Sequence, residues 1–186
     1  MTEWSIDREY YLKILNLFYQ MKVTLGDRVI VVGQETAGHL ISQFARIAGA
    51  SFIAGCGQEV NISRKNMLDV YTSLQELNNL EQISLDSFFG KAKTIDVLID
   101  TLGSWNVIEN FLHYIIDGGR VELIAEEYQK SADIDFYKDI HRRSLILNSI
   151  RVDISSDMTS ADLKHNDKFL DYLIKSKKLD ILHILD

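Results

Sequence analysis

The feature that most constrains the fold is a short β-branched run followed by a glycine turn and an amphipathic stretch. Residues 28–32 are Arg-Val-Ile-Val-Val, a composition typical of a strand buried on both faces of a parallel sheet. A turn bounded by Gly33 and Gly38 follows, and from 39 to 48 apolar residues recur at helical spacing. Residues 52–54 form a second short apolar run. This order predicts one strand–helix–strand unit over residues 28–54.

The alternation of strands and helices continues to the end of the chain. Periodicity predicts helices over 7–21, 63–77, 105–116 and 162–175, and strands over 96–100, 120–125 and 144–154, with a weaker one over 82–85. Such alternation predicts an α/β fold, a Rossmann-like, doubly wound, mostly parallel six-stranded sheet with helices on both faces. We expect residues 1–23 to form an N-terminal helix packed on the Rossmann-type domain of residues 24–186.

Composition narrows the classes of function. The net charge of −7 disfavours nucleic-acid binding, because phosphates are bound by clustered Lys and Arg. No apolar run approaches the ~20 residues that a membrane span needs. The single cysteine, Cys56, excludes an intramolecular disulfide and a cysteine zinc cluster. We therefore expect a cytoplasmic protein without zinc that binds neither nucleic acid nor a membrane.

Several segments of the chain also match a known pattern when they are taken in order. The matching segments, in chain order, are residues 25–33 with Gly38, then 45–50, 95–104, 118–124 and 163–180. In order and spacing, these segments resemble the nucleotide-binding domain of the medium-chain, zinc-type alcohol-dehydrogenase-like family. The resemblance implies an oxidoreductase fold with NAD(P) as its dinucleotide.

In that family a catalytic domain precedes this region and supplies the zinc ligands. Only 23 residues precede Thr24 here, and they contain neither Cys nor His. The resemblance thus implies a chain that is incomplete for catalysis alone, as either a fragment or a stand-alone domain.

The turn after the first strand is the candidate dinucleotide site. In a Gly-x-Gly-x-x-Gly fingerprint the first glycine makes the turn, the second lets the backbone approach the pyrophosphate, and the third allows close helix–strand packing. Gly33 and Gly38 match the first and third positions, but Glu35 occupies the middle one, where its charge opposes an anionic ligand. Two interpretations stay open. The glycines serve only the turn and packing, or a nucleotide binds with Glu35 turned outward.

The residues expected near the adenosine ribose leave the choice of cofactor open. NAD-selective sites place an Asp or Glu about 20 residues beyond the turn, and that position falls here at Gly55 or Cys56. Arg64 and Lys65 could hold the 2′-phosphate of NADP, or form a solvated charge pair at a helix start. If a dinucleotide binds, the sequence slightly favours NADP.

Further candidate residues follow the fourth and fifth predicted strands. Thr101 to Ser104 lie at a carboxyl end, where open α/β sheets bind ligands, although Ser104 could simply cap the next helix. The resemblance adds the backbone of Leu123 and Ile124 against the nicotinamide. The predicted cofactor contacts are Gly33, Gln34, Glu35, Thr36, Ala37, Gly38, Cys56, Arg64, Thr101, Leu102, Gly103, Ser104, Leu123 and Ile124. No catalytic residue is identified.

Two hypotheses for the function follow. The chain is an NAD(P)-binding domain of an alcohol-dehydrogenase-like oxidoreductase that needs a missing catalytic domain, or it is a non-catalytic Rossmann scaffold or partner-binding subunit that has lost the cofactor. A methyltransferase-like enzyme fits less well, because the acidic ribose ligand is missing. In either case the resemblance implies a homodimer through the apolar edge strand at 145–154.

Overall fold

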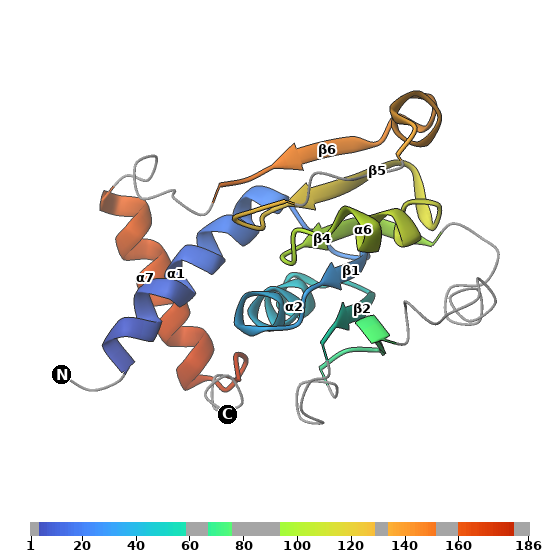
Figure 1. Ribbon diagram of the computed structural model, residues 1–186. Helices are drawn as coiled ribbons and strands as arrows, with labels where there is room; N and C mark the ends of the chain where they lie inside the picture. The colour runs from blue at the N-terminus through green and yellow to red at the C-terminus, as the bar shows by residue number, and fades with distance from the viewer. Residues whose placement is uncertain (1–3, 59–66, 76–93, 129–133, 152–159, 181–186) are drawn as a thin grey trace.

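The protein is built on one parallel sheet of six strands with helices on both faces (Figure 1). The computed structural model describes residues 4–58, 67–75, 94–128, 134–151 and 160–180. The strands are β1 (Arg28–Val32), β2 (Phe52–Gly57), β3 (Val70–Ser73), β4 (Ile95–Asp100), β5 (Ile115–Leu123) and β6 (Ile146–Ser149). Their order is β3-β2-β1-β4-β5-β6, and every neighbouring pair is parallel. This is the Rossmann order, so the predicted fold class is confirmed.

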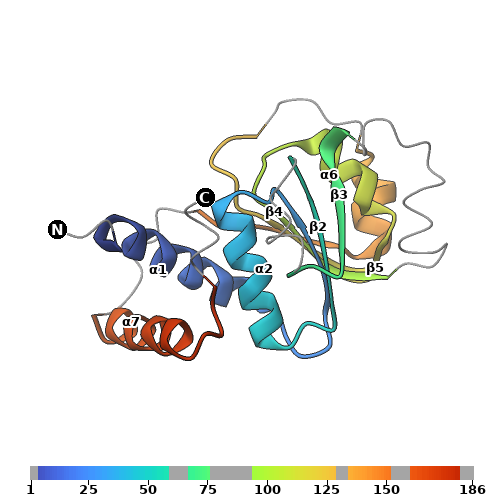
Figure 2. The same ribbon diagram turned by 90° about the horizontal axis from the view of Figure 1, so that it is seen from below.

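The helices are divided between the two faces of the sheet. They are α1 (Trp4–Met21), α2 (Thr36–Ala48), α6 (Trp105–Leu112) and α7 (Ser160–Lys175), with a π-helical turn at Phe136–Ile140 and a 3-10 turn at His141–Arg143. Figure 2 shows α1, α2 and α7 on one side of the sheet and α6 on the other. None of the helices in the described part of the chain is both long and apolar enough to traverse a lipid bilayer.

Strand β1 explains why the sheet needs cover on both faces. Val29 and Val31 belong to the core shared with α1, α2 and α7, whereas Ile30 and Val32 belong to the core shared with α6. Side chains alternate across a strand, so an uninterrupted apolar run fills both layers at once. The apolar pattern of residues 28–32 therefore correctly predicts a central, doubly covered strand.

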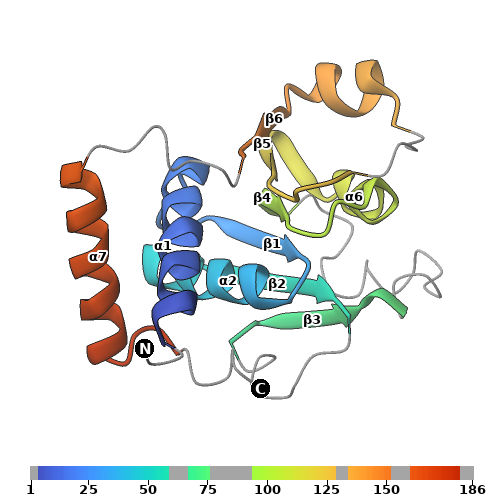
Figure 3. The ribbon, with the colours of Figure 1, turned by 60° about the vertical axis from the view of Figure 1, so that its left-hand side comes forward.

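Helix α1 is held on the sheet through α2 and α7. Figure 3 shows α1 running beside α7, at the side of the sheet that α2 covers. The guanidinium of Arg8 donates to Asp167 at 2.7 Å and to Asp171 at 2.8 Å, which joins the two ends of the chain. Met21 and Leu17 are completely or almost completely buried. Helix α1 is thereby fixed close to the carboxyl ends of the central strands.

Two predicted helices are partly wrong. Residues 70–73, predicted as helical, form β3, which pairs with β2 from Ala54 to Gly57. Their β-branched and aromatic side chains favour a strand, and apolar spacing over so short a run does not distinguish the two states. The helix predicted to reach residue 116 ends at Leu112, and Ile115 begins β5 beside Ile95.

The bounds of the other elements differ less, and some predictions fall outside the described residues. Helix α2 begins at Thr36 rather than at residue 39, so it contains Gly38. The weak strand at 82–85 and residues 152–154 of the predicted last strand lie outside the described part of the chain.

Candidate functional site

The turn between β1 and α2 has the close packing that the glycine pattern predicts. Gly33 has φ +88°, and a Cβ there would lie 2.1 Å from Thr101 Oγ1. A Cβ on Gly38 would lie 1.7 Å from the carbonyl oxygen of Gly33. Only glycine fits either position without displacing neighbours, so α2 can pack directly against the end of β1. The geometry of the first and third fingerprint glycines is therefore present.

Glu35 stands at the first residue before α2. Its backbone is extended, with φ −71° and ψ −167°, and its carbonyl accepts a hydrogen bond from the N–H of His39 at 2.9 Å. Its carboxylate makes no capping hydrogen bond, and the side chain is exposed to solvent beside the helix N-terminus. A negative charge is thus placed where an anionic ligand of a Rossmann turn would sit.

A cleft of about 630 Å³ opens at the carboxyl ends of β1, β4 and β5. This is the point where the strand order reverses, and open α/β sheets bind ligands there. One wall comes from α1, through Tyr10, Ile14 and Leu17, which sequence reasoning did not include. The cleft is therefore closed on one side by the N-terminal helix.

The structure brings only part of the predicted site together. The predicted residues that line the cleft are Gly33, Glu35, Thr36, Ala37, Thr101, Leu102 and Ile124. The predicted residues that do not line it are Gln34, Gly38, Cys56, Gly103, Ser104 and Leu123. Arg64, like Lys65, lies outside the described residues. Ala125, expected at the end of the fifth strand, also lines the cleft. Further lining residues that were missed are Glu126 and Glu127, which follow β5 and could have been found by the carboxyl-end rule that identified Thr101.

Gln34 fills the space at the end of β2. Its side chain is buried, and its Nε2 donates to the carbonyl of Val31 at 3.0 Å. A Cβ on Gly55 would lie 3.2 Å from this Nε2, and one on Gly57 would lie 2.9 Å from the Gln34 backbone nitrogen. Gln34 therefore packs over the strand end where the ribose of a dinucleotide is bound in Rossmann domains.

A buried carboxylate, Asp100, organises two of the loops that line the cleft. It accepts hydrogen bonds from the N–H groups of Leu102 at 3.2 Å and Gly103 at 3.0 Å. The Tyr128 hydroxyl also bonds to this carboxylate, while accepting from the N–H of Ala125 at 3.3 Å. Burial raises the pKa of Asp100, although these hydrogen bonds oppose the rise. Asp100 thus links the loop after β4 to the loop after β5.

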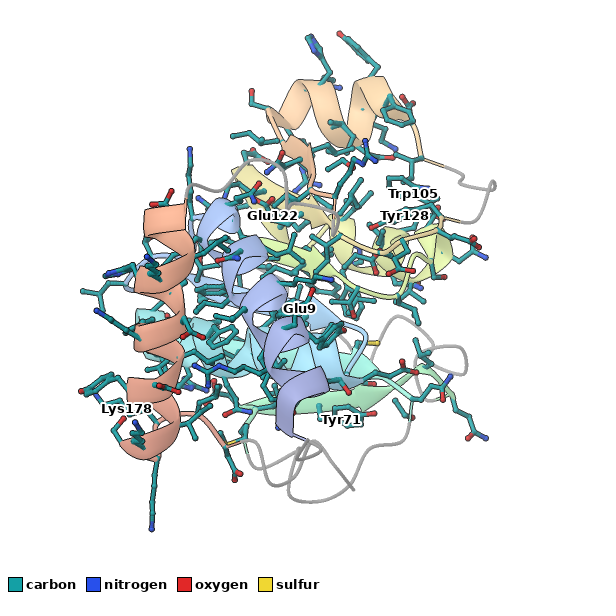
Figure 4. All side chains as sticks on the ribbon, turned by 90° about the vertical axis from the view of Figure 1, so that its left-hand side faces the viewer. Glu9, Tyr71, Trp105, Glu122, Tyr128 and Lys178 are labelled. Carbon is teal, nitrogen blue, oxygen red and sulfur yellow. The ribbon has the colours of Figure 1, made fainter. Side chains whose placement is uncertain are left out.

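The same region is tightly packed around Tyr128. Figure 4 shows Trp105 beside Tyr128, and the ring centroids are 5.6 Å apart. A Cβ on Gly103 would lie 1.9 Å from the carbonyl oxygen of Glu127. Ser104 is the N-cap residue of α6, but its side chain makes no capping hydrogen bond. The two loops consequently present a preformed wall to the cleft.

Cys56 is not a reactive thiol in this environment. It lies at 0% exposure in β2, and burial, with the nearby Asp100 charge, raises the pKa of its thiol to about 12. Thiolate is the nucleophilic form, so the side chain behaves as a small apolar core residue. Its role here is packing beneath the turn, where its carbonyl accepts from the Gly33 N–H at 2.6 Å.

The charged groups that line the cleft are all acidic. Among the described residues around it, Glu35, Glu126 and Glu127 are the charged ones, and none is basic. Tyr10 lines the same cleft: burial raises the pKa of its hydroxyl, and the charges of Glu126 and Glu35 raise it further. The cleft is therefore a region of negative potential with a partly apolar wall.

Comparison with known proteins matches the fold but not the sequence. No protein-family model and no curated protein matches the chain. Solved structures that match include alcohol dehydrogenase TADH from Thermus sp. ATN1 (16% identity, TM-score 0.66, 91% of this chain and 46% of that one). Galactitol-1-phosphate dehydrogenase from Escherichia coli matches at 15% identity and TM-score 0.70, over 94% and 49% of the two chains. This chain has the Rossmann fold found in these alcohol-dehydrogenase-like oxidoreductases.

A third matching structure contains a bound dinucleotide. A protein described as a zinc-binding dehydrogenase from Sinorhizobium meliloti 1021, bound to NADP, has 16% identity and TM-score 0.67, over 92% of this chain and 48% of that one. The chain spans about half the length of the structures it matches.

The residues of this chain fit a dinucleotide only in part. The turn geometry at Gly33 and Gly38 fits, because both glycines allow the close backbone approach. The position of Glu35 does not fit a pyrophosphate, and Gln34 covers the end of β2. Among the described residues, the backbone shape of a dinucleotide site is present, but the charges that line the cleft are acidic and Gln34 occupies the end of β2.

Proposed function

We propose that this chain is a Rossmann domain of the alcohol-dehydrogenase type that has lost dinucleotide binding and serves as a non-catalytic binding subunit. The observation that carries the proposal is the set of three carboxylates, Glu35, Glu126 and Glu127, around the cleft in which a pyrophosphate would have to lie. The buried Gln34 side chain over Gly55 and Gly57 supports it independently.

The magnitudes favour exclusion of an anion. Two like charges about 4 Å apart repel by about 1 kcal/mol in bulk water and by about 4 kcal/mol at the effective dielectric constant of a protein surface. A helix N-terminus attracts an anion by only about 0.3–1 kcal/mol at an exposed position. Glu35 is exposed to solvent, so its repulsion lies at the lower end of this range and is comparable to the attraction that the start of α2 provides; Glu126 and Glu127 add to it.

The test is a titration of the purified chain with NADH and NADPH, followed by their fluorescence. We expect no saturable binding up to about 1 mM, which corresponds to less than about 4.1 kcal/mol of binding free energy. Glu35→Gln removes the charge and Glu35→Gly also removes the side chain, so the two variants separate electrostatic from steric exclusion. Glu109→Gln, a carboxylate on α6 away from the cleft, is the control. A wild-type dissociation constant tighter than about 100 µM would overturn the proposal.

A second candidate function rests on the turn itself. The packing of Gly33 against Thr101 and of Gly38 against Gly33 is what a dinucleotide-binding turn requires. On this alternative the chain is the NAD(P)-binding part of an oxidoreductase whose catalytic half lies elsewhere. The cofactor then supplies hydride transfer and the protein supplies its orientation. The NADP preference rests on Arg64, outside the described residues, and stays a prediction.

A homodimer through β6 is part of either proposal. This strand lies at one edge of the sheet, and Ile146 is 54% exposed on it. An edge strand with an exposed apolar side chain can pair with a second copy. Light scattering at micromolar concentration is expected to give twice the chain mass, and a monomer would refute the dimer. A cytoplasmic location likewise stays a prediction.

A further inference from the structure

The cleft combines features that together specify the chemistry of a ligand. Its volume of about 630 Å³ falls within the ~300–1,000 Å³ typical of small-molecule sites, and it occupies the ligand-binding position of the fold. Ile14, Leu17, Leu102 and Ile124 give it an apolar wall. The site is therefore a built cavity rather than a patch of charge on a convex surface.

The acidic groups that line this cavity come from two separate segments of the chain. Glu35 precedes α2, and Glu126 and Glu127 follow β5. Within the described part of the chain, none of the three forms an ion pair, whereas Asp27, Asp69, Asp96 and Asp171 all do. These cleft carboxylates are thus available to a ligand.

We propose that the cleft binds an organic cation with an apolar body, of the primary or quaternary amine class. The amine would lie among Glu35, Glu126 and Glu127, and the apolar body would lie against Ile14 and Leu102. This goes beyond the proposed function, which excludes a dinucleotide without saying what is bound. It rests on that proposal in one respect, since both depend on the negative charge of the cleft.

Tyr10 strengthens the case for an organic cation. Tyr10 lines the same cavity as the three carboxylates, and an aromatic face attracts ammonium groups. A metal ion fits less well. Among the described residues, no group of three or more His, Cys, Asp or Glu side chains is placed to hold one. Every charged side chain that the described residues present to the cleft opposes an anion.

The carboxylates are exposed to solvent, so the expected preference for a cation is modest and should depend on the salt concentration. Glu126 and Glu127 are exposed, so salt screens their attraction for a cation. We expect a preference for a cation over a neutral molecule of similar shape of about tenfold at low ionic strength. In 0.5 M NaCl the preference should fall to about threefold or less.

The experiment compares three probes of similar size on the full chain, using calorimetry or ligand-observed NMR. The probes are benzyltrimethylammonium, benzyl alcohol and benzoate. The expected order of affinity is cation, then alcohol, then anion, with about tenfold between the first two at low salt. A Glu126→Gln, Glu127→Gln double variant should bring the first two probes within threefold of each other. Glu109→Gln should leave the order and spacing unchanged.

Three results of this experiment would each overturn the proposal. Equal binding of benzyltrimethylammonium and benzyl alcohol, no binding of any probe, or an unchanged preference in the double variant would overturn it. Circular dichroism checks that the double variant folds. If it does not fold, Glu35→Gln supplies the same test with the carboxylate that precedes α2. Saturable NADPH binding with the cation preference intact would overturn the proposed function alone, and absence of a cation preference together with absence of NADPH binding would overturn this inference alone.

Discussion

Gly38→Ala tests the contact between α2 and the end of β1 on which the candidate site depends. The added Cβ would lie 1.7 Å from the carbonyl oxygen and 2.8 Å from the carbonyl carbon of Gly33. Both are backbone atoms held by the turn, so they cannot rotate away as a flexible side chain would. Helix α2 would have to move outward, and its buried face, which includes Leu40 and Phe44, would lose contact with the sheet.

The size of the effect follows from two opposing terms. Overpacking of a well-packed core costs about 1–3 kcal/mol, and more when backbone must move. Alanine in a helix stabilises it relative to glycine by about 0.5–1 kcal/mol. The overlap at Gly38 is with backbone at 1.7 Å, so we place the net loss in free energy of unfolding near 2 kcal/mol. For a chain of this length that lowers the melting temperature by about 4–8 °C.

Scanning calorimetry measures this change directly. Gly118→Ala is a matched control, because Gly118 has φ +79° but nothing within 4 Å of its Cβ position. It should cost about 1–2 kcal/mol from backbone strain alone, at a site remote from the turn. A Gly38→Ala protein that melts at or above the wild-type temperature would refute the packing argument.

Further predictions concern pH and thiol reactivity. Burial alone would raise the pKa of Asp96, but Arg28 holds it below its usual value by hydrogen bonds and charge, so its contribution to stability is lost as pH falls through the folded-state pKa. The pKa of Asp100 is raised by burial, so stability from its protonated form is lost as pH rises from the unfolded-state pKa through the folded one. Asp96→Asn should therefore cost more at neutral than at acidic pH and Asp100→Asn the reverse, as melting curves can show, and equal pH dependence would contradict this. Cys56, with its thiol pKa raised to about 12, should react with a disulfide reagent only as the chain unfolds, and rapid labelling of native protein would contradict its burial.

Much of the architecture could be predicted because local pattern and burial agree. The run from Arg28 to Val32 is apolar at every position after the first, and only a strand with cover on both faces explains it. The third strand could not be predicted in this way. Val70 and Tyr71 satisfy helical and extended spacing equally well, and pairing with β2 decides between them.

The part of the candidate site at the carboxyl ends of the strands could be predicted from the sequence. The carboxyl-end rule identified Thr101 and Leu102 after β4, and applied to β5 it would also have identified Glu126. The wall formed by Tyr10 depends on the packing of α1 beside the sheet, which no local pattern specifies. The position of Gln34 over the end of β2 is likewise a tertiary contact.

On both proposals made above, the cleft at the reversal of strand order rejects a dinucleotide and accepts a cation. The most direct measurement is an amide NMR titration of the labelled chain with NADPH and with benzyltrimethylammonium. We expect shifts at Gly33, Thr101 and Ala125 with the cation and none there with NADPH. Shifts at those residues with NADPH at micromolar concentration, and none with the cation, would contradict both proposals.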